Sequence, residues 1–429
     1  MPEITPMQVV EKIMRDRKIV YFKGEFYEYD RGVYRKRTLE WCKKLAVNIL
    51  KSQSSRLALG DVIELLSIQS ARETSEEENE KRILNLKNGL FCLDTYTPKP
   101  HTPDYFSVVQ VPIEYVPEAE CKRWIRFLGE CFPRQSDVTP LIQEWFGYCL
   151  VPDCRQQKAM VLVGEGANGK SVFCGVLSDL VGRENVSAVS LSQLGQTFTV
   201  ALIQGKLLNV TTEVEMKRSL EEGIFKALIA GDPVKAERKY EPPFFFKPYA
   251  RFLIATNNLP SVNDTSDGLF RRLIIVRFEE QISEEKQDRD LPAKLRGELS
   301  GILNWALEGL KRLEARGRFD IPASVAEEIE EYRQESNHVR LWREECTKSS
   351  CTDWTTAEAL WQSYRKWCLE KEVSPFSNIK FGKELGRLLR TKSVLVGDAR
   401  NRKRGYKGIL LNDAVSESDR QNEQDEQVS

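Results

Sequence analysis

The feature that most constrains the fold is a glycine-rich stretch near the middle of the chain, Gly164-Glu-Gly-Ala-Asn-Gly-Lys-Ser171. The apolar run before it, Met160–Val163, is typical of a buried parallel strand, and Val172–Leu180 after it has helical apolar spacing. Strand, glycine-rich loop and helix in this order form the context of a phosphate-binding loop. The stretch therefore predicts a nucleotide-binding α/β core rather than an ordinary glycine turn.

The loop residues are predicted to hold a nucleoside triphosphate together with Mg²⁺. Glycines let backbone N–H groups close around phosphates, and the N-terminus of the following helix adds positive potential. The Lys170 ammonium group can reach the β- and γ-phosphates, and the Ser171 hydroxyl can ligate Mg²⁺. The candidate nucleotide-binding residues are consecutive: Gly164, Glu165, Gly166, Ala167, Asn168, Gly169, Lys170 and Ser171.

Two later apolar runs are predicted to be strands that end in polar groups. Lys206–Glu213 ends in Glu213, whose carboxylate can polarise an attacking water. Ala250–Thr256 is followed by Asn257, whose amide can contact the γ-phosphate or that water. No second acid precedes Glu213, so metal ligation falls to Ser171 and water, with Thr212 or Glu215 as further candidate ligands. The alternative for Glu213, a surface glutamate after a core strand, stays open.

A hairpin is predicted between these two strands. Val234–Glu237 and Phe244–Lys247 form its arms, and Arg238, Lys239 and Tyr240 lie around its tip. A cation beside an aromatic ring suits a phosphate and a sugar or base, so the tip is a candidate nucleic-acid contact.

Two adjacent arginines, Arg271 and Arg272, stand immediately before a continuous apolar strand. In a ring of subunits, arginines so placed can reach the γ-phosphate held by the neighbouring subunit, as an arginine finger does. The alternative is a pair of salt-bridged arginines at a helix end.

The N-terminal region, residues 1–150, is predicted to be a mixed α+β domain. Aromatic alternation in Val20–Tyr34 and the Asn-Gly turn in Asn85–Asp94 indicate two hairpins. Helices are expected at Thr38–Lys51, Leu57–Gln69, Glu118–Leu128 and Pro140–Leu150. Nothing in the region has catalytic spacing, and its aromatic residues are interpreted as packing within their own domain.

The C-terminal region is predicted to be a winged helix-turn-helix that binds DNA. Helices are expected at Ile321–Trp342, Thr355–Glu370 and Ser377–Leu389, and a two-stranded wing at Ser393–Val396 and Lys407–Leu411. The basic cluster favours phosphate contact over a merely solvated face. Its candidate DNA-binding residues are Lys380, Lys383, Arg387, Arg402, Lys403 and Arg404. Residues 413–429 are acidic and rich in Gln and Ser, and a disordered tail is expected there.

Composition narrows the class of protein. The formal net charge is zero, so any affinity for nucleic acid must come from local patches. The ten cysteines are scattered without a Cys-x-x-Cys, and no signal peptide or membrane-length apolar run is seen, so a cytoplasmic chain with reduced thiols and no membrane contact is expected. A zinc site at Cys346 and Cys351 lacks a second ligand pair. With two histidines in all, a histidine-based triad is excluded.

The order of these features resembles a superfamily 3 helicase of the AAA+ class, and more narrowly the helicase part of the phage/plasmid and poxvirus-type helicase–primases. In the core, the resemblance rests on the loop Gly164–Ser171, on Gly231-Asp-Pro and on Phe270-Arg-Arg-Leu. In the N-terminal region it rests on Gly32-Val-Tyr, Asn85-Leu-Lys-Asn-Gly and Gly147-Tyr.

The resemblance implies a hexameric ring around DNA, with ATP and Mg²⁺ at the subunit interfaces and 3′-to-5′ translocation. It implies four domains: residues 1–150, an ATPase core at 151–315, a winged helix at 330–412 and the tail at 413–429. The implied roles are as follows: Lys170 and Ser171 for the phosphate loop, Glu213 for the second acidic motif, Asn257 for the sensor, Arg272 in preference to Arg271 for the finger, and Lys239 with Tyr240 for the DNA-tracking tip. The chain departs from the family in carrying Tyr240 where many viral members have histidine, and in lacking the first acid of the acidic motif.

The sequence thus predicts an ATP-dependent DNA helicase that acts in the replication of a phage, plasmid or integrated mobile element. It is expected to bind single-stranded and duplex DNA. Three alternatives stay open. The first is an ATP-dependent origin-binding protein without unwinding activity. The second is a helicase subunit that works with a separate primase, and the third is a small-molecule phosphotransferase.

Overall fold

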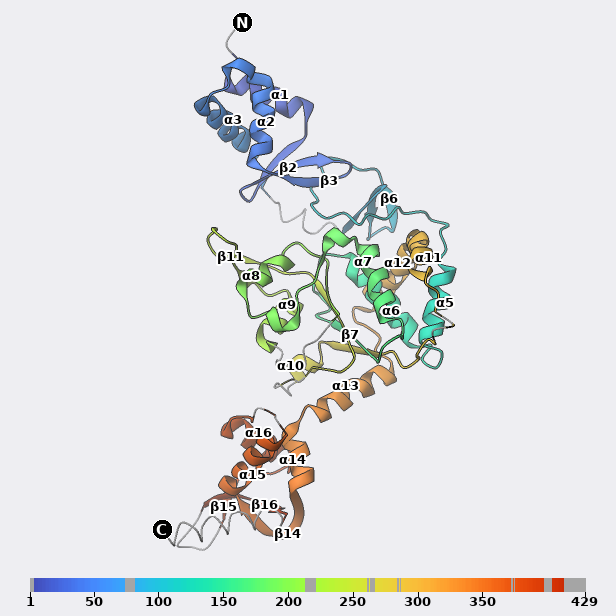
Figure 1. Cartoon of the computed structure of the whole chain (residues 1–429), viewed down its shortest axis with the longest axis vertical. Coiled ribbons are helices and arrows are strands. Elements are labelled where there is room, and N and C mark those ends of the chain that lie inside the picture. Colours follow the sequence, from blue (N-terminus) through green and yellow to red (C-terminus); the bar gives the residue numbers. More distant parts are fainter. Residues whose placement is uncertain are drawn as a thin grey trace. The chain divides into compact units, whose positions relative to one another are not determined.

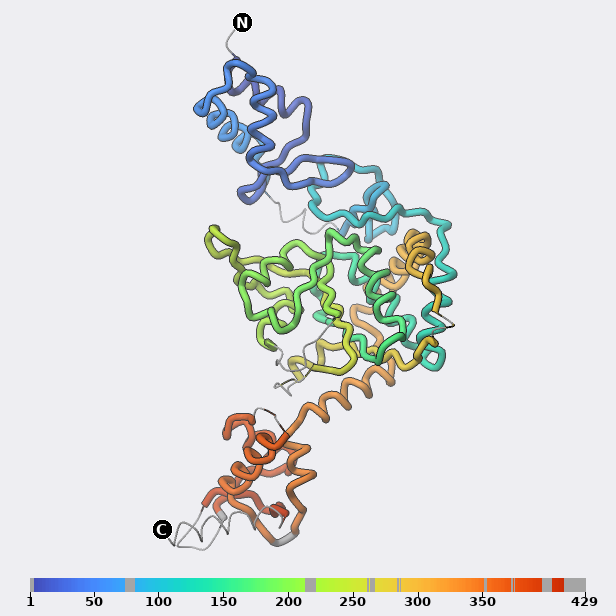
Figure 2. The backbone as a smooth tube through the Cα atoms, viewed as in Figure 1, coloured from blue at the N-terminus to red at the C-terminus, as the bar shows by residue number. Residues whose placement is uncertain are grey.

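The computed structural model describes residues 4–73, 82–212, 221–260, 262, 267–283, 285, 287–371, 373, 375–396 and 403–412. The chain forms two compact units (Figures 1 and 2). The first comprises Met1–Val214, Gly223–Asn258 and Ile274–Pro322, and the second comprises Glu215–Glu222, Leu259–Leu273 and Ala323–Ser429. Glu213, Arg402 and the acidic tail at 413–429 lie outside the described residues.

The N-terminal part of the first unit combines three helices with two small antiparallel sheets. The helices share one apolar core and are α1 Pro6–Asp16, α2 Leu39–Leu50 and α3 Arg56–Gln69. One sheet has the order β1-β2-β3, with strands Ile19–Phe22, Glu25–Asp30 and Val33–Arg37. The other has the order β4-β5-β6, with strands Ile83–Leu86, Gly89–Cys92 and Thr97–Lys99. Both predicted hairpins are present, and each gains a third strand that the sequence did not indicate.

A glycine in the turn between β2 and β3 contacts the second N-terminal sheet. The Asn85 side-chain amide donates to the Gly32 carbonyl over 2.7 Å, and His101 Nε2 lies 2.9 Å from the Leu86 carbonyl. The Gly32 backbone has φ +90°, and a Cβ built there would lie 2.4 Å from the His101 ring. Two of the segments that carried the family resemblance, at Gly32 and Asn85, therefore meet and have a structural role.

Replacing Gly32 with alanine should destabilise the N-terminal domain more than replacing Gly24. Both have positive φ, but Gly24 has nothing within 4 Å of its missing Cβ. The strained backbone alone costs about 1 kcal/mol for Gly24→Ala, and the clash with His101 should bring Gly32→Ala to about 3 kcal/mol. Urea unfolding of the two variants measures the difference; equal losses would contradict the close packing on His101.

The central part of the first unit is built on a five-stranded sheet with the order β13-β7-β12-β9-β8. The pairs β7–β12, β12–β9 and β9–β8 are parallel. The strands are β7 Ala159–Val163, β8 Val186–Ser187, β9 Leu208–Thr211, β12 Arg251–Thr256 and β13 Leu273–Arg277. Every residue of β7 and β12 is buried, which confirms the expected buried parallel strands. A separate antiparallel pair, β10 Val234–Ala236 and β11 Phe244–Phe246, forms the predicted hairpin.

Helices surround this sheet, and α6, α7 and α12 pack together beside it (Figure 1). The helices are α5 Lys122–Cys131, α6 Val138–Leu150, α7 Lys170–Val181, α8 Thr197–Val200, α9 Glu222–Ala230, α11 Leu291–Gly297 and α12 Leu299–Arg316. The buried Glu144 carboxylate of α6 pairs with Arg312 and Arg316 of α12 at 2.8 and 2.6 Å. A Cβ on Gly147 would lie 2.4 Å from the Ala306 carbonyl, so these helices approach backbone to backbone.

The second unit holds one short helix, α10 Asp267–Phe270, and the C-terminal elements. Those are α13 Ala323–Glu335, α14 His338–Cys346, β14 Thr347–Thr356, α15 Ala357–Glu370, α16 Asn378–Leu388, β15 Val394–Val396 and β16 Lys403–Leu411. The three strands form an antiparallel sheet with the order β14-β16-β15. The single helix predicted at Ile321–Trp342 is wrong, because the helix is interrupted at Ser336 and Asn337. The Asn337 side chain accepts from the Arg340 N–H and caps α14.

Aromatic residues of α15 lie in the core of this C-terminal part, as expected. Leu360, Tyr364 and Trp367 are buried against Trp342 and Phe381. His338 belongs to the same core, where its Nδ1 lies 2.8 Å from the Tyr364 hydroxyl and burial lowers its pKa to about 4.

Candidate functional site

The glycine-rich loop lies where the parallel strands end. Val163, the last residue of β7, is paired with Thr256, the last residue of β12, and Thr211 ends β9 beside Ile254. The Gly164 N–H donates to the Thr256 carbonyl over 3.3 Å, and Asn257 follows directly with an exposed side chain. Because carboxyl ends of parallel strands share one sheet edge, the loop and Asn257 lie at the edge where such sheets bind ligands.

Two glycines give the loop its shape for different reasons. A Cβ on Gly164 would lie 2.4 Å from both the Phe278 carbonyl and the Asn168 amide nitrogen. Gly169 has φ +95° as the N-cap of α7, and a Cβ there would lie 3.0 Å from Cys131 Sγ. Neither position accommodates a side chain, so the sequence at these positions is dictated by the backbone path.

The Lys170 ammonium group lies inside the loop rather than in open solvent. Its Nζ is 2.5 Å from the Gly164 carbonyl and 3.1 Å from both the Glu165 carbonyl and Asn168 Oδ1. The residue is 8 % exposed, and burial lowers the pKa of the ammonium group. Ser171, one residue further along α7, is exposed.

Asn168 organises the loop from within. It is buried, and its amide donates to the Phe278 carbonyl over 3.2 Å while its oxygen faces Lys170. Glu165, Gly166 and Ala167 around it are exposed. The sequence pattern places Asn168 among the nucleotide ligands, whereas in the structure its side chain holds the lysine and the loop together.

The segment after β13 braces the loop, and the sequence did not indicate it. The Phe278 N–H donates to the Val163 carbonyl over 2.7 Å, and the Ile282 N–H donates to the Ala167 carbonyl over 2.9 Å. Gln281 Nε2 lies 3.2 Å from a Glu165 carboxylate oxygen. The sequence offered one clue to this segment, namely its position directly after the strand that follows the two arginines.

The two arginines belong to the second unit. The Arg271 N–H donates to the Asp267 carbonyl over 3.1 Å and the Arg272 N–H to the Leu269 carbonyl over 2.9 Å, so both continue the turn of α10. Arg271 is exposed, and the half-buried Arg272 guanidinium donates to the Gly268 carbonyl. Both arginines therefore lie at a helix end.

The β10–β11 hairpin projects from the core as a yellow-green arm (Figure 2). Tyr240 at its tip is fully exposed with φ +64°, and Lys239 beside it is exposed. Arg238 lies against the stem, with its guanidinium 2.6 Å from Gln204 Oε1 and 4.8 Å from the centre of the Phe244 ring. Lys239 and Tyr240 are thus the side chains free to meet a ligand at the tip, and Arg238 supports the hairpin.

The C-terminal part of the second unit carries a basic groove of about 1020 Å³ between α16 and the sheet. Among the described residues, the lining includes the cationic side chains of Lys383, Arg387, Arg390, Lys392 and Arg404 and no carboxylate. The sequence pattern missed Arg390 and Lys392. Lys380 is not part of the groove, since its Nζ lies 3.5 Å from the centre of the Phe376 ring, and Lys403 is exposed at the start of β16.

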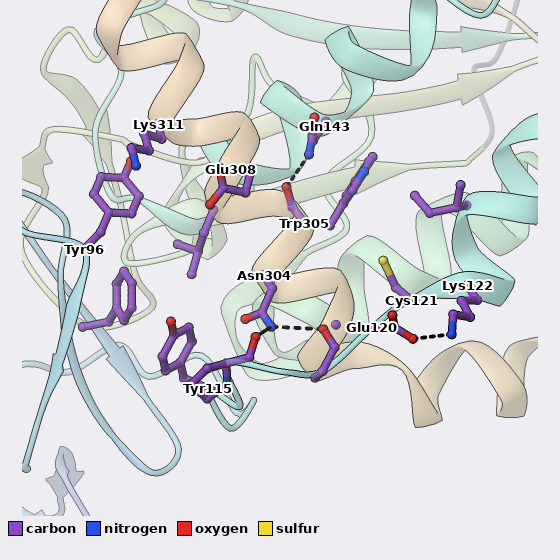
Figure 3. Close-up of a pocket in the computed structure, with 16 residues that line it drawn as sticks. Tyr96, Tyr115, Glu120, Cys121, Lys122, Gln143, Asn304, Trp305, Glu308 and Lys311 are labelled. Carbon is purple, nitrogen blue, oxygen red and sulfur yellow. Dashed lines mark hydrogen bonds and ion pairs between the residues drawn. The ribbon is translucent and has the colours of Figure 1, made fainter.

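A second cavity, of about 830 Å³, lies in the first unit between aromatic residues of the N-terminal part and helices α5 and α12 (Figure 3). Tyr96, Tyr115 and Asn304 are among its lining residues, and the Asn304 amide donates to the Val116 carbonyl over 2.8 Å. None of its lining residues belongs to the glycine-rich loop.

Two family models match parts of the chain. A family model described as D5 N terminal like matches residues 9–133, and a family of unknown function, DUF5906, matches residues 162–272, which include the glycine-rich loop and both arginines.

Two curated relatives match parts of the chain. A protein of Acanthamoeba polyphaga mimivirus named "Putative helicase L207/L206" is 25 % identical over 207 residues, which cover 46 % of this chain and 22 % of the viral protein. The uncharacterized mitochondrial protein ymf21 of Marchantia polymorpha is 29 % identical over 96 residues, 22 % of this chain and 53 % of that protein. The chain thus spans between about a fifth and a half of the length of these relatives.

Solved structures share the fold over nearly the whole chain. The C-terminal region of NrS-1 aligns with a TM-score of 0.54 at 12 % identity, over 94 % of this chain and 100 % of that one. A structure of NrS-1 residues 305–718 gives 0.55 at 12 % identity over 95 % of this chain. The mixed α/β architecture with its parallel sheet is therefore a known one. Within the described residues, no helix is both long and apolar enough to span a bilayer.

Proposed function

We propose that the chain is an ATP-dependent DNA helicase of the superfamily 3, AAA+ type that acts in replication of a phage, plasmid or integrated mobile element. The observation that carries the proposal is the placement of Lys170 in a glycine loop at the carboxyl edge of a parallel sheet, with Asn257 following the neighbouring strand. This edge is where open α/β sheets bind nucleotides.

The chemistry assigned to the loop follows from its contacts. Lys170 holds its charge against three loop oxygens, and a triphosphate in the loop would take over some of these hydrogen bonds. Mg²⁺ fits the site because it requires one or two protein oxygens beside phosphate and water, and the exposed Ser171 hydroxyl supplies one. Asn257 is proposed to orient the attacking water, and Glu213 is proposed as its base from the sequence alone.

DNA is the substrate that the two exposed basic features fit best. The hairpin tip offers Lys239 for a phosphate and Tyr240 for stacking. The C-terminal elements follow the order helix, strand, helix, helix, strand, strand, which is the order of a winged helix-turn-helix, and the basic groove lies beside its third helix. A small-molecule phosphotransferase needs neither feature.

We further propose that the active form is a homo-oligomeric ring, as a hexamer around DNA. Arg271 and Arg272 belong to a different unit from the glycine-rich loop, which suits a role toward the nucleotide of a neighbouring subunit. The helicase name of the mimivirus relative and the D5-type match to residues 9–133 support the assignment to replication.

Strand displacement tests the proposal. The protein should unwind a forked duplex only when ATP and Mg²⁺ are both present, and single-stranded DNA should stimulate its ATP hydrolysis. ATP-dependent DNA binding without displacement would favour an origin-binding protein, or a helicase subunit that needs a separate primase. ATP hydrolysis indifferent to DNA would instead favour the phosphotransferase.

A further inference from the structure

The segment that presents the two arginines is held by α13, the helix that leads into the C-terminal domain. Both arginine backbones are hydrogen-bonded to the one-turn helix α10. The position of α10 therefore determines the position of the two arginine backbones, from which the guanidinium groups extend. Figure 1 shows α10 beside α13, and both belong to the second unit.

Two adjacent residues of α13 make the contacts. The Tyr332 hydroxyl donates to the Pro260 carbonyl over 2.6 Å, and its ring meets Phe270 edge-on at 5.5 Å between centroids. The Arg333 guanidinium pairs with the Asp267 carboxylate at 2.8 Å and lies 5.9 Å from the centre of the Phe270 ring. Pro260 precedes α10 in the chain and Asp267 begins it, so α13 contacts both the residue Pro260 and α10 itself.

These contacts are better placed to fix geometry than to add stability. Asp267 is largely exposed, and exposed ion pairs contribute little to folding. Tyr332 and Phe270 are buried, at 5 % and 3 % exposure, so their edge-on packing allows little displacement. The boundary between the two units falls after Leu273, one residue past the arginines. The arginine pair therefore belongs to the same unit as α13 and the C-terminal elements.

We propose that Tyr332 and Arg333 are positioning residues for the Arg271–Arg272 pair, so that the helix entering the DNA-binding domain sets how the arginines are presented to a neighbouring subunit. This inference rests on the proposed function, in which those arginines complete an ATP site in trans. It adds a residue pair that touches neither nucleotide nor DNA and yet controls turnover.

The test uses Tyr332→Phe combined with Arg333→Gln, which removes the hydrogen bond and the ion pair but keeps an aromatic ring on Phe270. A displaced arginine should lower kcat for ATP hydrolysis about tenfold, while KM for ATP stays within about twofold because the nucleotide loop is untouched. Glu327→Gln with Glu331→Gln, two exposed positions of the same helix, is the matched control and should retain wild-type kcat. Thermal unfolding checks that both variants fold.

Mixing separates positioning from damage. Wild-type arginines supplied by a Lys170→Ala partner should restore turnover to the Tyr332→Phe/Arg333→Gln protein, because its own loop is intact. Wild-type kcat in the α13 variant, or a lowered kcat that mixing does not restore although it restores Arg272→Ala, would overturn the inference. If neither Arg271→Ala nor Arg272→Ala lowers kcat, the trans arginine of the proposed function fails first and this inference falls with it.

Discussion

Replacing Lys170 by alanine is expected to lower kcat for ATP hydrolysis by at least about 100-fold, because charge developing on the transferred phosphoryl group loses its nearest cation. The ammonium group lies within 3.1 Å of three loop oxygens and is the only cation that these contacts bring into the loop among the described residues. A steady-state phosphate-release assay with and without single-stranded DNA measures the loss.

Lys206→Ala is the matched control for this variant. The Lys206 ammonium group, in the same unit, makes a solvent-exposed hydrogen bond of 2.5 Å to the Glu184 carbonyl. The Lys206→Ala protein should hydrolyse ATP at the wild-type rate. If the Lys170 variant keeps more than about a tenth of wild-type kcat, the glycine-rich loop is not the site of phosphoryl transfer.

Removing the hairpin tip is expected to uncouple hydrolysis from unwinding. Lys239→Ala with Tyr240→Ala should cut strand displacement by about 100-fold, since both the phosphate contact and the stacking surface are lost. ATP hydrolysis without DNA should stay near the wild-type rate, because the exposed tip supports no core contact. A gel-based displacement assay read beside phosphate release measures both.

Two further variants sharpen the hairpin test. Lys247→Ala removes an exposed cation from the base of the same hairpin and should displace strands normally. Tyr240→His introduces the residue that many viral superfamily 3 helicases carry at this position. This variant should retain most of the strand-displacement activity. Normal displacement by the double alanine variant would show that DNA is gripped elsewhere.

Local signals made the strand, the glycine-rich loop and the following helix predictable. An unbroken apolar run, a glycine motif and a helical repeat lie within about twenty residues. The structure shows why glycine is required at Gly164 and Gly169, where a Cβ would lie too close to neighbouring atoms. Gly231 is similar: its φ of +76° ends α9, and a Cβ there would lie 3.0 Å from Cys154.

Long-range pairing explains what the sequence did not reveal. β14 reads Thr-Lys-Ser-Ser-Cys-Thr-Asp-Trp-Thr-Thr, without apolar alternation, and becomes a strand by pairing with β16. The basic groove gains Arg390 and Lys392 because the chain turns back after α16, which no spacing rule encodes. Lys380 was grouped with Lys383 and Arg387 by helical spacing, but its side chain leans onto Phe376.

ATP hydrolysis at a junction between two copies of the chain is the central proposal, and subunit mixing tests it directly. Lys170→Ala protein and Arg272→Ala protein, each inactive alone, should recover a substantial fraction of wild-type ATP hydrolysis when combined, because one copy lends an intact loop and the other an intact arginine pair. An Arg271→Ala series run in parallel shows which arginine acts. Absence of recovery, together with wild-type protein that hydrolyses ATP at full rate as a monomer, would contradict the proposed machine.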